Sequence, residues 1–151
     1  MVKKKKLVII GAGSHSSVVA EAAELMGYSI EGYIDPFSVK SKEEKKILSF
    51  SSIKKIKKKV KIIIAVGDNK KRSKLYSYYK KNLFSYAKVI HPSAIVASSV
   101  KIGEGTFVSA GSILNANTKI LNNSIINSGS IIEHDSLVKN HVHIAPGVKI
   151  G

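Results

Sequence analysis

One histidine of the sequence, His134, is flanked directly by two carboxylates, Glu133 and Asp135. An imidazole has a pKa close to neutral pH, so it can take a proton from an attacking amine or hydroxyl group. A carboxylate bonded to one ring nitrogen fixes the tautomer and raises the basicity of the ring. These residues are therefore candidates for general-base chemistry, with the alternative that an exposed histidine is often inert.

A second candidate site follows the apolar run Leu7 to Ile10, where the chain continues as Gly11-Ala12-Gly13-Ser14-His15. A dinucleotide-binding turn has a third glycine, but Ser16 stands at that position, which disfavours a nicotinamide enzyme. Backbone N–H groups at a helix N-terminus still bind phosphates, and Ser14 and His15 lie at this entrance. The alternative is a tight turn at Gly11 and Gly13 in which Ser14 only caps the helix.

Two further acidic residues lie at strand ends: Asp35 is the last residue of the second predicted strand, and Asp68 follows the third, after Gly67. The carboxyl ends of parallel strands meet at one edge of a sheet, where such folds bind nucleotides. Asp35 has the position that bonds a ribose hydroxyl in folds of this type. We expect Asp35, Gly67 and Asp68 to line the same substrate site as Gly13, or else to be ordinary turn residues.

Strands and helices alternate in the pattern that should position these residues. We predict strands over 7–10, 28–35 and 61–66 and helices over 14–26 and 70–82. The lysine-rich residues 38–61 predict a loop with a short helix around Ile53 and Ile56. The alternation predicts a small α/β, Rossmann-like domain with a parallel sheet over residues 1–89.

A strict six-residue period begins at Ile90 and continues to the last residues of the chain. An aliphatic residue recurs at every sixth position. Most of the residues three positions after it tolerate a left-handed backbone, such as Gly105 and Asn117. One aliphatic residue and one tight turn per hexad, with three hexads per 18-residue coil, predict a parallel β-helix over residues 90–151. The aliphatic positions are Ile90, Val96, Ile102, Val108, Leu114, Ile120, Ile126, Ile132, Val138, Ile144 and Ile150.

The composition excludes several classes of protein. The 151 residues include no cysteine, which excludes a disulfide scaffold and a thiolate metal site. The longest apolar runs are too short for a membrane span, and no signal peptide is visible, so we expect a cytoplasmic protein. The net charge of +15 lies mostly in residues 1–89, but it comes almost entirely from lysine, which argues against nucleic-acid binding.

Together, the Gly11 to His15 turn, the Ile90-His91-Pro92-Ser93-Ala94 junction and the segment Ile126 to Asp135 resemble a known family. The chain is similar to bacterial sugar acetyltransferases of the left-handed β-helix, or hexapeptide-repeat, class. Its nearest counterparts are UDP-4-amino-sugar N-acetyltransferases and sialic acid O-acetyltransferases. The resemblance implies a left-handed β-helix, a homotrimer, and acetyl-CoA bound between neighbouring β-helices.

The resemblance also implies roles for individual residues. His134 corresponds to the general base and Asp135 to its acidic partner, with Asn127 near the acceptor. His143 corresponds to a second histidine of the family and is expected to bind acetyl-CoA. A metal site is not expected, because His134, His141 and His143 would lie on different sides of the β-helix.

The expected function is therefore acetyl-CoA-dependent N-acetylation of a UDP-linked 4-amino sugar in surface-glycan biosynthesis. Two alternatives stay open: O-acetylation of a sialic acid, or a non-catalytic sugar-nucleotide-binding or scaffold protein. The sequence stops at Gly151, one residue into a new hexad. We accordingly expect the β-helix domain, residues 90–151, to be truncated at its C-terminus relative to the family.

Overall fold

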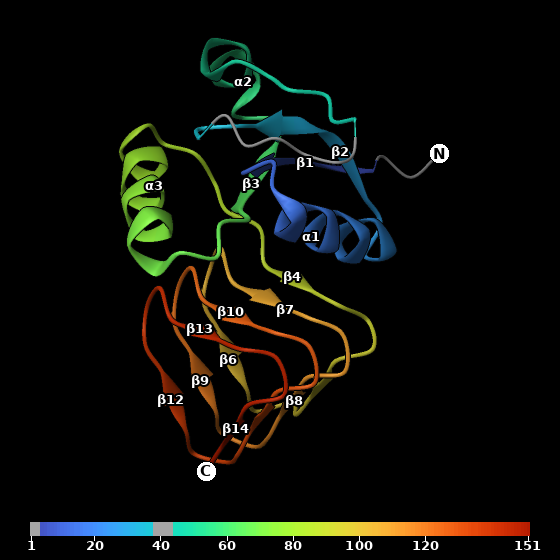
Figure 1. Cartoon of the computed structure of the whole chain (residues 1–151), viewed down its shortest axis with the longest axis vertical. Coiled ribbons are helices and arrows are strands. Elements are labelled where there is room, and N and C mark those ends of the chain that lie inside the picture. Colours follow the sequence, from blue (N-terminus) through green and yellow to red (C-terminus); the bar gives the residue numbers. More distant parts are fainter. Residues whose placement is uncertain (1–3, 38–43) are drawn as a thin grey trace.

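The computed structural model describes residues 4–37 and 44–151, in which an α/β unit lies on one side of a triangular β-helix (Figure 1). Sheet A of the α/β unit contains β1 (Lys5–Ile10), β2 (Tyr28–Ile34) and β3 (Lys61–Ile64), all parallel, in the order β2-β1-β3. The central strand β1 is buried from Leu7 to Ile10, as expected for a parallel sheet covered on both faces. This arrangement confirms the predicted Rossmann-like sheet.

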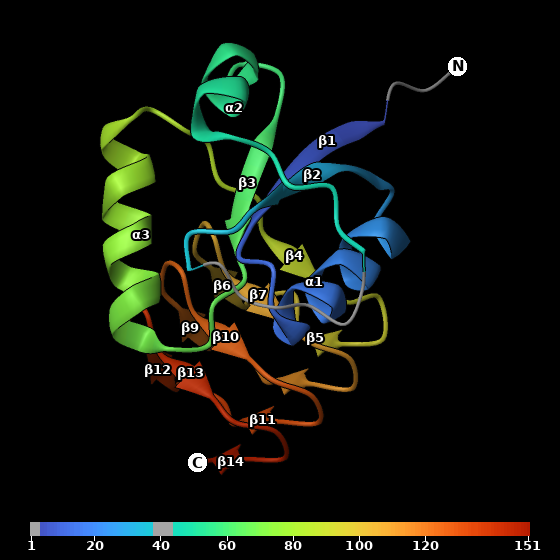
Figure 2. The same cartoon turned by 45° about the horizontal axis from the view of Figure 1, so that its top comes forward.

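Helices cover both faces of sheet A. Helix α1 (Ser14–Leu25) packs its buried face, which includes Val19 and Ala23, against Leu7 and Ile9. The opposite face packs against α2 (Phe50–Ile56) and α3 (Asn69–Lys81), which lie on the far side of the sheet from α1 (Figure 2). The predicted helices are confirmed to within one residue at their ends. No helix in residues 4–37 and 44–151 is long and apolar enough to cross a membrane.

Three sheets of two-residue parallel strands form the β-helix, and partners in one sheet are 18 residues apart, as in the pair Ile125 and Phe107. The chain visits sheets B, C and D in turn. Sheet B contains β4 (Val89–Ile90), β7 (Phe107–Val108), β10 (Ile125–Ile126) and β13 (His143–Ile144). Sheet C contains β5 (Ile95–Val96), β8 (Ile113–Leu114), β11 (Ile131–Ile132) and β14 (Lys149–Ile150). Sheet D contains β6 (Lys101–Ile102), β9 (Lys119–Ile120) and β12 (Leu137–Val138).

The aliphatic residues of the hexads form the interior of this left-handed β-helix. All of them belong to one apolar core, fully buried from Val108 to Ile144 and partly buried towards the two ends. The turn positions from Gly105 to Gly147 have the predicted left-handed backbone, with φ values of 62° at Asn117 and 59° at Asp135. The six-residue period therefore predicts both the core and the corners.

Sheet B attaches the β-helix to the α/β unit. The outward-facing side chains of Phe107 and Ile125 are buried in the same apolar core as Val19 and Ala23 of α1. Helix α1 is consequently held between sheet A and sheet B (Figures 1 and 2). The corner between sheets C and D is the vertex of the triangle opposite sheet B, on the side away from the α/β unit.

Candidate functional site

The loops after the three parallel strands lie together at the carboxyl edge of sheet A. Gly11 follows the central strand, and its N–H donates to the carbonyl of Ile34 at the end of β2 (2.7 Å). Gly11 has a φ of 115°, and a Cβ there would lie 2.7 Å from the carbonyl oxygen of Ala65, so only glycine fits. The close approach of these three loops creates the edge at which the sequence predicted a nucleotide site.

At this edge, α1 begins without a side-chain cap. Gly13 is the N-cap residue and Ser14 is the exposed first residue of the helix, so the interpretation of Ser14 as the cap is wrong. Ser16 is fully buried, and its hydroxyl donates to the Gly13 carbonyl (2.6 Å). Ser16, which stands at the position of the third glycine, therefore stabilises the turn by its own hydrogen bond. The Lys45 ammonium also donates to the Gly13 carbonyl (3.3 Å), which adds a cation that was not predicted at this edge.

Both predicted aspartates lie at this edge, and both also stabilise local turns. Asp35 accepts a hydrogen bond from the N–H of Phe37 (3.3 Å). Asp68 is the N-cap of α3 and accepts from the N–H of Lys71 (2.8 Å), which lowers the pKa of the carboxyl group. Each aspartate thus has one carboxylate oxygen engaged in an intramolecular bond.

A second group of predicted residues joins this edge from sheet B. Nδ2 of Asn127 donates to Nε2 of His143 (3.1 Å), so Nε2 is the acceptor and Nδ1 carries the proton. Nδ1 lies 3.3 Å from the Gly67 carbonyl, to which it can donate. An open pocket beside this chain of contacts is lined by Gly67, Asp68, Asn69, Lys70, His143 and Ala145.

His15 lies against the same cluster. Its ring is stacked at 6.4 Å from the ring of His143 and packs edge-on against Phe107 at 5.5 Å. Burial, and then the nearby His143 and Arg72, lower the pKa of His15 to about 4, so the ring is neutral at neutral pH. Its Nε2 is buried without a hydrogen-bond partner among the described residues. The His15 ring, stacked on His143 of the pocket lining, therefore carries an unsatisfied polar atom.

Arg72 is a site-forming residue that sequence reasoning missed. It is fully buried, and desolvation lowers its pKa to about 10. Its guanidinium ties the loop after β3 to two corners of the β-helix, and so fixes the Gly67 carbonyl that His143 faces. The acceptors are the carbonyls of Val66, Gly67, Asn123 and His141 and the side chain of Asn69, at 2.7 to 3.0 Å.

His134 and Asp135 lie on the corner between sheets C and D. Nδ1 of His134 is 2.8 Å from Oδ2 of Asp135, and the two side chains are 72% and 67% exposed. The hydrogen bond and the negative charge of Asp135 raise the pKa of His134. Asn117 donates to the other oxygen of Asp135 (3.1 Å), whereas Glu133 accepts from Asn115. Asp135 rather than Glu133 is therefore the carboxylate that orients the imidazole.

The predicted site residues thus form two groups in one chain. Gly13, His15, Gly67, Asn127 and His143 gather between the carboxyl edge of sheet A and sheet B. The pair His134 and Asp135 occupies the vertex opposite sheet B. Among the residues that the structure describes, no group of three His, Asp or Glu side chains could hold a metal ion.

Comparison with known proteins supplies a family. Residues 6–79 match the family model of the PglD N-terminal domain. The acetyltransferase domain of PglB from Neisseria gonorrhoeae is 30% identical, with 96% of this chain and 73% of that chain aligned at a TM-score of 0.86. The same domain has been solved in complex with acetyl coenzyme A.

PerB from Caulobacter crescentus, in complex with CoA and GDP-perosamine, is also 30% identical. The alignment covers 97% of this chain and 70% of PerB at a TM-score of 0.84. WeeI from Acinetobacter baumannii, at 22% identity and a TM-score of 0.81, has the same fold. With an N-terminal α/β unit, a hexapeptide β-helix and these relatives, the chain belongs to the hexapeptide-repeat sugar acetyltransferases.

Proposed function

We propose that this acetyltransferase moves the acetyl group of acetyl-CoA to the amine of a UDP-linked 4-amino sugar in surface-glycan biosynthesis. The observation that carries the proposal is the exposed imidazole of His134, oriented and made more basic by Asp135. The acetyl coenzyme A complex of the PglB domain and the complex of PerB with CoA and GDP-perosamine support the two substrate classes. The UDP linkage rests on the resemblance in sequence.

In the proposed reaction, His134 is the general base. Its Nδ1 is bonded to Asp135, so Nε2 accepts the proton as the amine nitrogen attacks the thioester carbonyl. The new C–N bond forms, the C–S bond breaks, and the imidazolium returns the proton to the departing thiolate of CoA. Asp135 stabilises the imidazolium without taking the proton.

Residues 1–89 would serve as the sugar-nucleotide module and residues 90–151 as the acyl-transfer module. The N–H groups at Gly13 and Ser14 would bind phosphate, with the Lys45 ammonium adding positive charge. The ligand would supply the hydrogen-bond partner that Nε2 of His15 lacks among the described residues. The remaining proposed contacts are Asp35, Gly67 and Asp68 with the nucleotide sugar, Asn127 with the acceptor and His143 with acetyl-CoA.

We further propose that the active site is shared between subunits of a homotrimer. Within one chain, His134 lies on the vertex opposite sheet B, away from the cluster around His143, so His134 would serve a neighbouring subunit. The outer face of sheet C supports this arrangement, because Ile95, Ile113 and Ile131 stack there in an apolar row. Ile95 is 65% exposed in the single chain, as expected for a surface that a second copy covers.

The test is CoA release with a UDP-4-amino sugar, GDP-perosamine and free sialic acid as acceptors. We expect turnover with the UDP-linked amine and a loss of roughly 10²- to 10⁴-fold in the His134→Ala variant. His91→Ala is the matched control, because His91 is another corner histidine and its ring bonds to nearby Ser93. Turnover with sialic acid alone would identify an O-acetyltransferase, and nucleotide-sugar binding without turnover would identify a binding module.

A further inference from the structure

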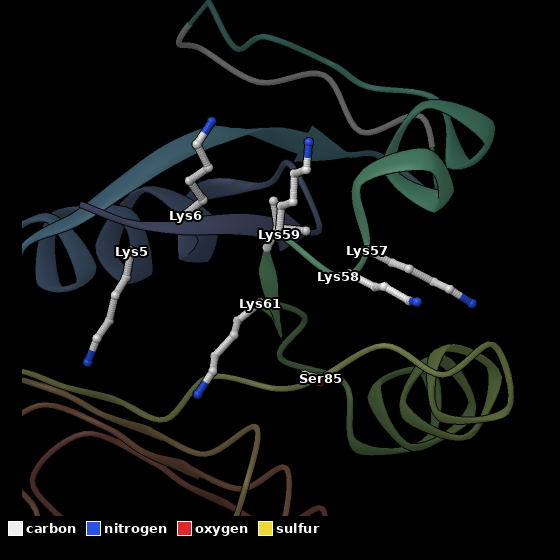
Figure 3. Close-up of a pocket in the computed structure, with 8 residues that line it drawn as sticks. Lys5, Lys6, Lys57, Lys58, Lys59, Lys61 and Ser85 are labelled. Carbon is white, nitrogen blue, oxygen red and sulfur yellow. The ribbon is translucent and has the colours of Figure 1, made fainter. Parts of the chain in front are cut away.

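Seven lysines surround the amino edge of sheet A. They come from the start of β1, the segment after α2 and the first residue of β3, and two adjoining hollows are lined by them. Figure 3 shows the side chains of all of these lysines except Lys4, extending away from the sheet on both sides of this edge. The lysine face, as we name it, consists of Lys4, Lys5, Lys6, Lys57, Lys58, Lys59 and Lys61.

The lysine face is far from the groups that the proposed reaction uses. The strands of sheet A are parallel, so the starts of β1 and β3 lie at one edge and Gly13 and Gly67 at the other. The six residues of β1 separate the two edges by about 20 Å. The reaction therefore gives no reason for a concentration of positive charge here.

This charge is almost unbalanced. Within residues 4–37 and 44–151, the one ion pair of the lysine face joins Lys6 to Glu31 at 3.2 Å. The sequence has no acidic residue between Lys45 and Gly67. Lysines held together without carboxylates repel one another and attract an anionic partner.

The side chains of the lysine face suit lipid phosphates better than nucleic acid. The sole arginine of the chain is the buried Arg72, and the residues lining the hollows include no aromatic side chain. Binding to bases uses arginine forks and aromatic stacking. Lysine acts as a point charge, which is sufficient for the diffuse negative charge of phospholipid headgroups.

An exposed leucine adjoins the lysine face. The Lys57 ammonium donates to the carbonyl of Asn82 (3.4 Å), and the next residue, Leu83, is 76% exposed. Leu83 has a φ of 61°, a conformation unusual for leucine, and so this apolar side chain is held out beside the lysines by the turn after α3. Lysines beside an exposed apolar side chain are typical of surfaces that bind the membrane interface.

We propose that the lysine face, with Leu83, docks this protein onto the surface of an anionic phospholipid membrane. The lysines bind headgroup phosphates, and Leu83 enters the boundary between headgroups and acyl chains. Binding is peripheral and reversible, and the carboxyl edge of sheet A, with the nucleotide site proposed there, faces away from the membrane.

The test is co-sedimentation of the full chain with vesicles of phosphatidylcholine and phosphatidylglycerol in a ratio of about 3:1, and with pure phosphatidylcholine. We expect binding to the anionic vesicles only, weakening as the salt concentration rises from about 0.05 to about 0.3 M. The triple variant Lys5→Gln, Lys58→Gln, Lys59→Gln should bind roughly 100-fold more weakly. The control Lys101→Gln, Lys119→Gln, Lys139→Gln removes the same charge from exposed positions of the β-helix and should lose less than about tenfold.

Leu83→Asn tests the apolar contribution, because asparagine tolerates the same backbone conformation. This variant should bind the anionic vesicles several-fold more weakly at every salt concentration, whereas the lysine triple variant should differ most at low salt. Equal losses in the two triple variants would overturn the proposal, since net charge alone would then explain binding. So would tighter binding to a DNA duplex than to the vesicles at the same salt. The binding to vesicles and the binding to DNA are both measured without acetyl transfer.

Discussion

The imidazole of His134 owes its raised pKa mainly to Asp135, with a smaller contribution from the charge of Glu133. Replacing Asp135 with Asn removes the charge and the strongest hydrogen bond that favour the protonated ring. The pKa of His134 should fall, and the acid limb of kcat against pH should move to lower pH, with a lower plateau from the weaker base. Glu133→Gln is the matched control, because Glu133 bonds to Asn115 and should shift the limb less. An unmoved limb in Asp135→Asn would exclude His134 as the titrating base.

His15 should make the protein less stable in mild acid. Its pKa is about 4 in the folded chain and near 6.5 in the unfolded chain, so the unfolded state binds more protons between these values. Stability should therefore decrease as the pH falls through this window. Relative to His15→Phe, the native protein should lose about 2 kcal/mol more of unfolding free energy between about pH 7.5 and about pH 5. Urea titrations measure the free energy of unfolding at each pH. If its dependence on pH were the same in the native protein and in His15→Phe, a buried neutral His15 would be contradicted.

Sequence reasoning identified single residues where chemistry is local. His134 and Asp135 are adjacent in the chain, so their hydrogen bond could be expected from spacing alone. The contact between His143 and Gly67 joins positions 76 residues apart and depends on how sheet B packs on the α/β unit. Arg72 looked like one more cation of a lysine-rich helix, because nothing in its neighbourhood indicates that it is buried.

At the level of elements, Arg72 connects α3, the loop after β3 and two corners of the β-helix. In Arg72→Met, one buried and three partly buried carbonyls lose this donor, and the free energy of unfolding should fall by about 3–5 kcal/mol. Lys74→Met on the same helix is the control, since Lys74 is exposed and its loss should cost less than about 0.5 kcal/mol. Urea denaturation measures both. Equal free energies of unfolding for the two variants would mean that water replaces the guanidinium as hydrogen-bond donor in Arg72→Met.

Periodic elements could be predicted almost completely, and irregular ones only in outline. The period of six predicts the strands and the corners because each coil repeats the same packing and the same turn. The first two corner residues, Ser93 and Ser99, depart from the pattern, because neither has a positive φ. The hydroxyl of Ser99 instead accepts from the N–H of Asn117 one coil further on (2.8 Å). The lysine-rich region predicted α2 correctly around Ile53, whereas residues 38–43, for which a loop was predicted, lie outside the described residues.

At the level of the whole molecule, a shared active site predicts complementation between inactive variants. His134→Ala lacks the proposed base, and Ser14→Glu places a negative charge where phosphate is expected to bind. Neither should be active alone. Mixed trimers from co-expression should recover about a quarter of native turnover, because about one subunit boundary in four then combines an intact base with an intact nucleotide site. Inactive mixed trimers would mean that both groups act within one chain.

The apolar core that α1 shares with Phe107 and Ile125 makes the stabilities of the two units interdependent. Neither unit can melt while the other stays intact without exposing this core to water, so heating should produce one cooperative transition rather than two. A molecule that binds the folded α/β unit alone therefore also protects the β-helix against heat. Binding of the proposed nucleotide sugar to the α/β unit should therefore raise the temperature at which the coils that carry His134 unfold, before any acetyl group is transferred.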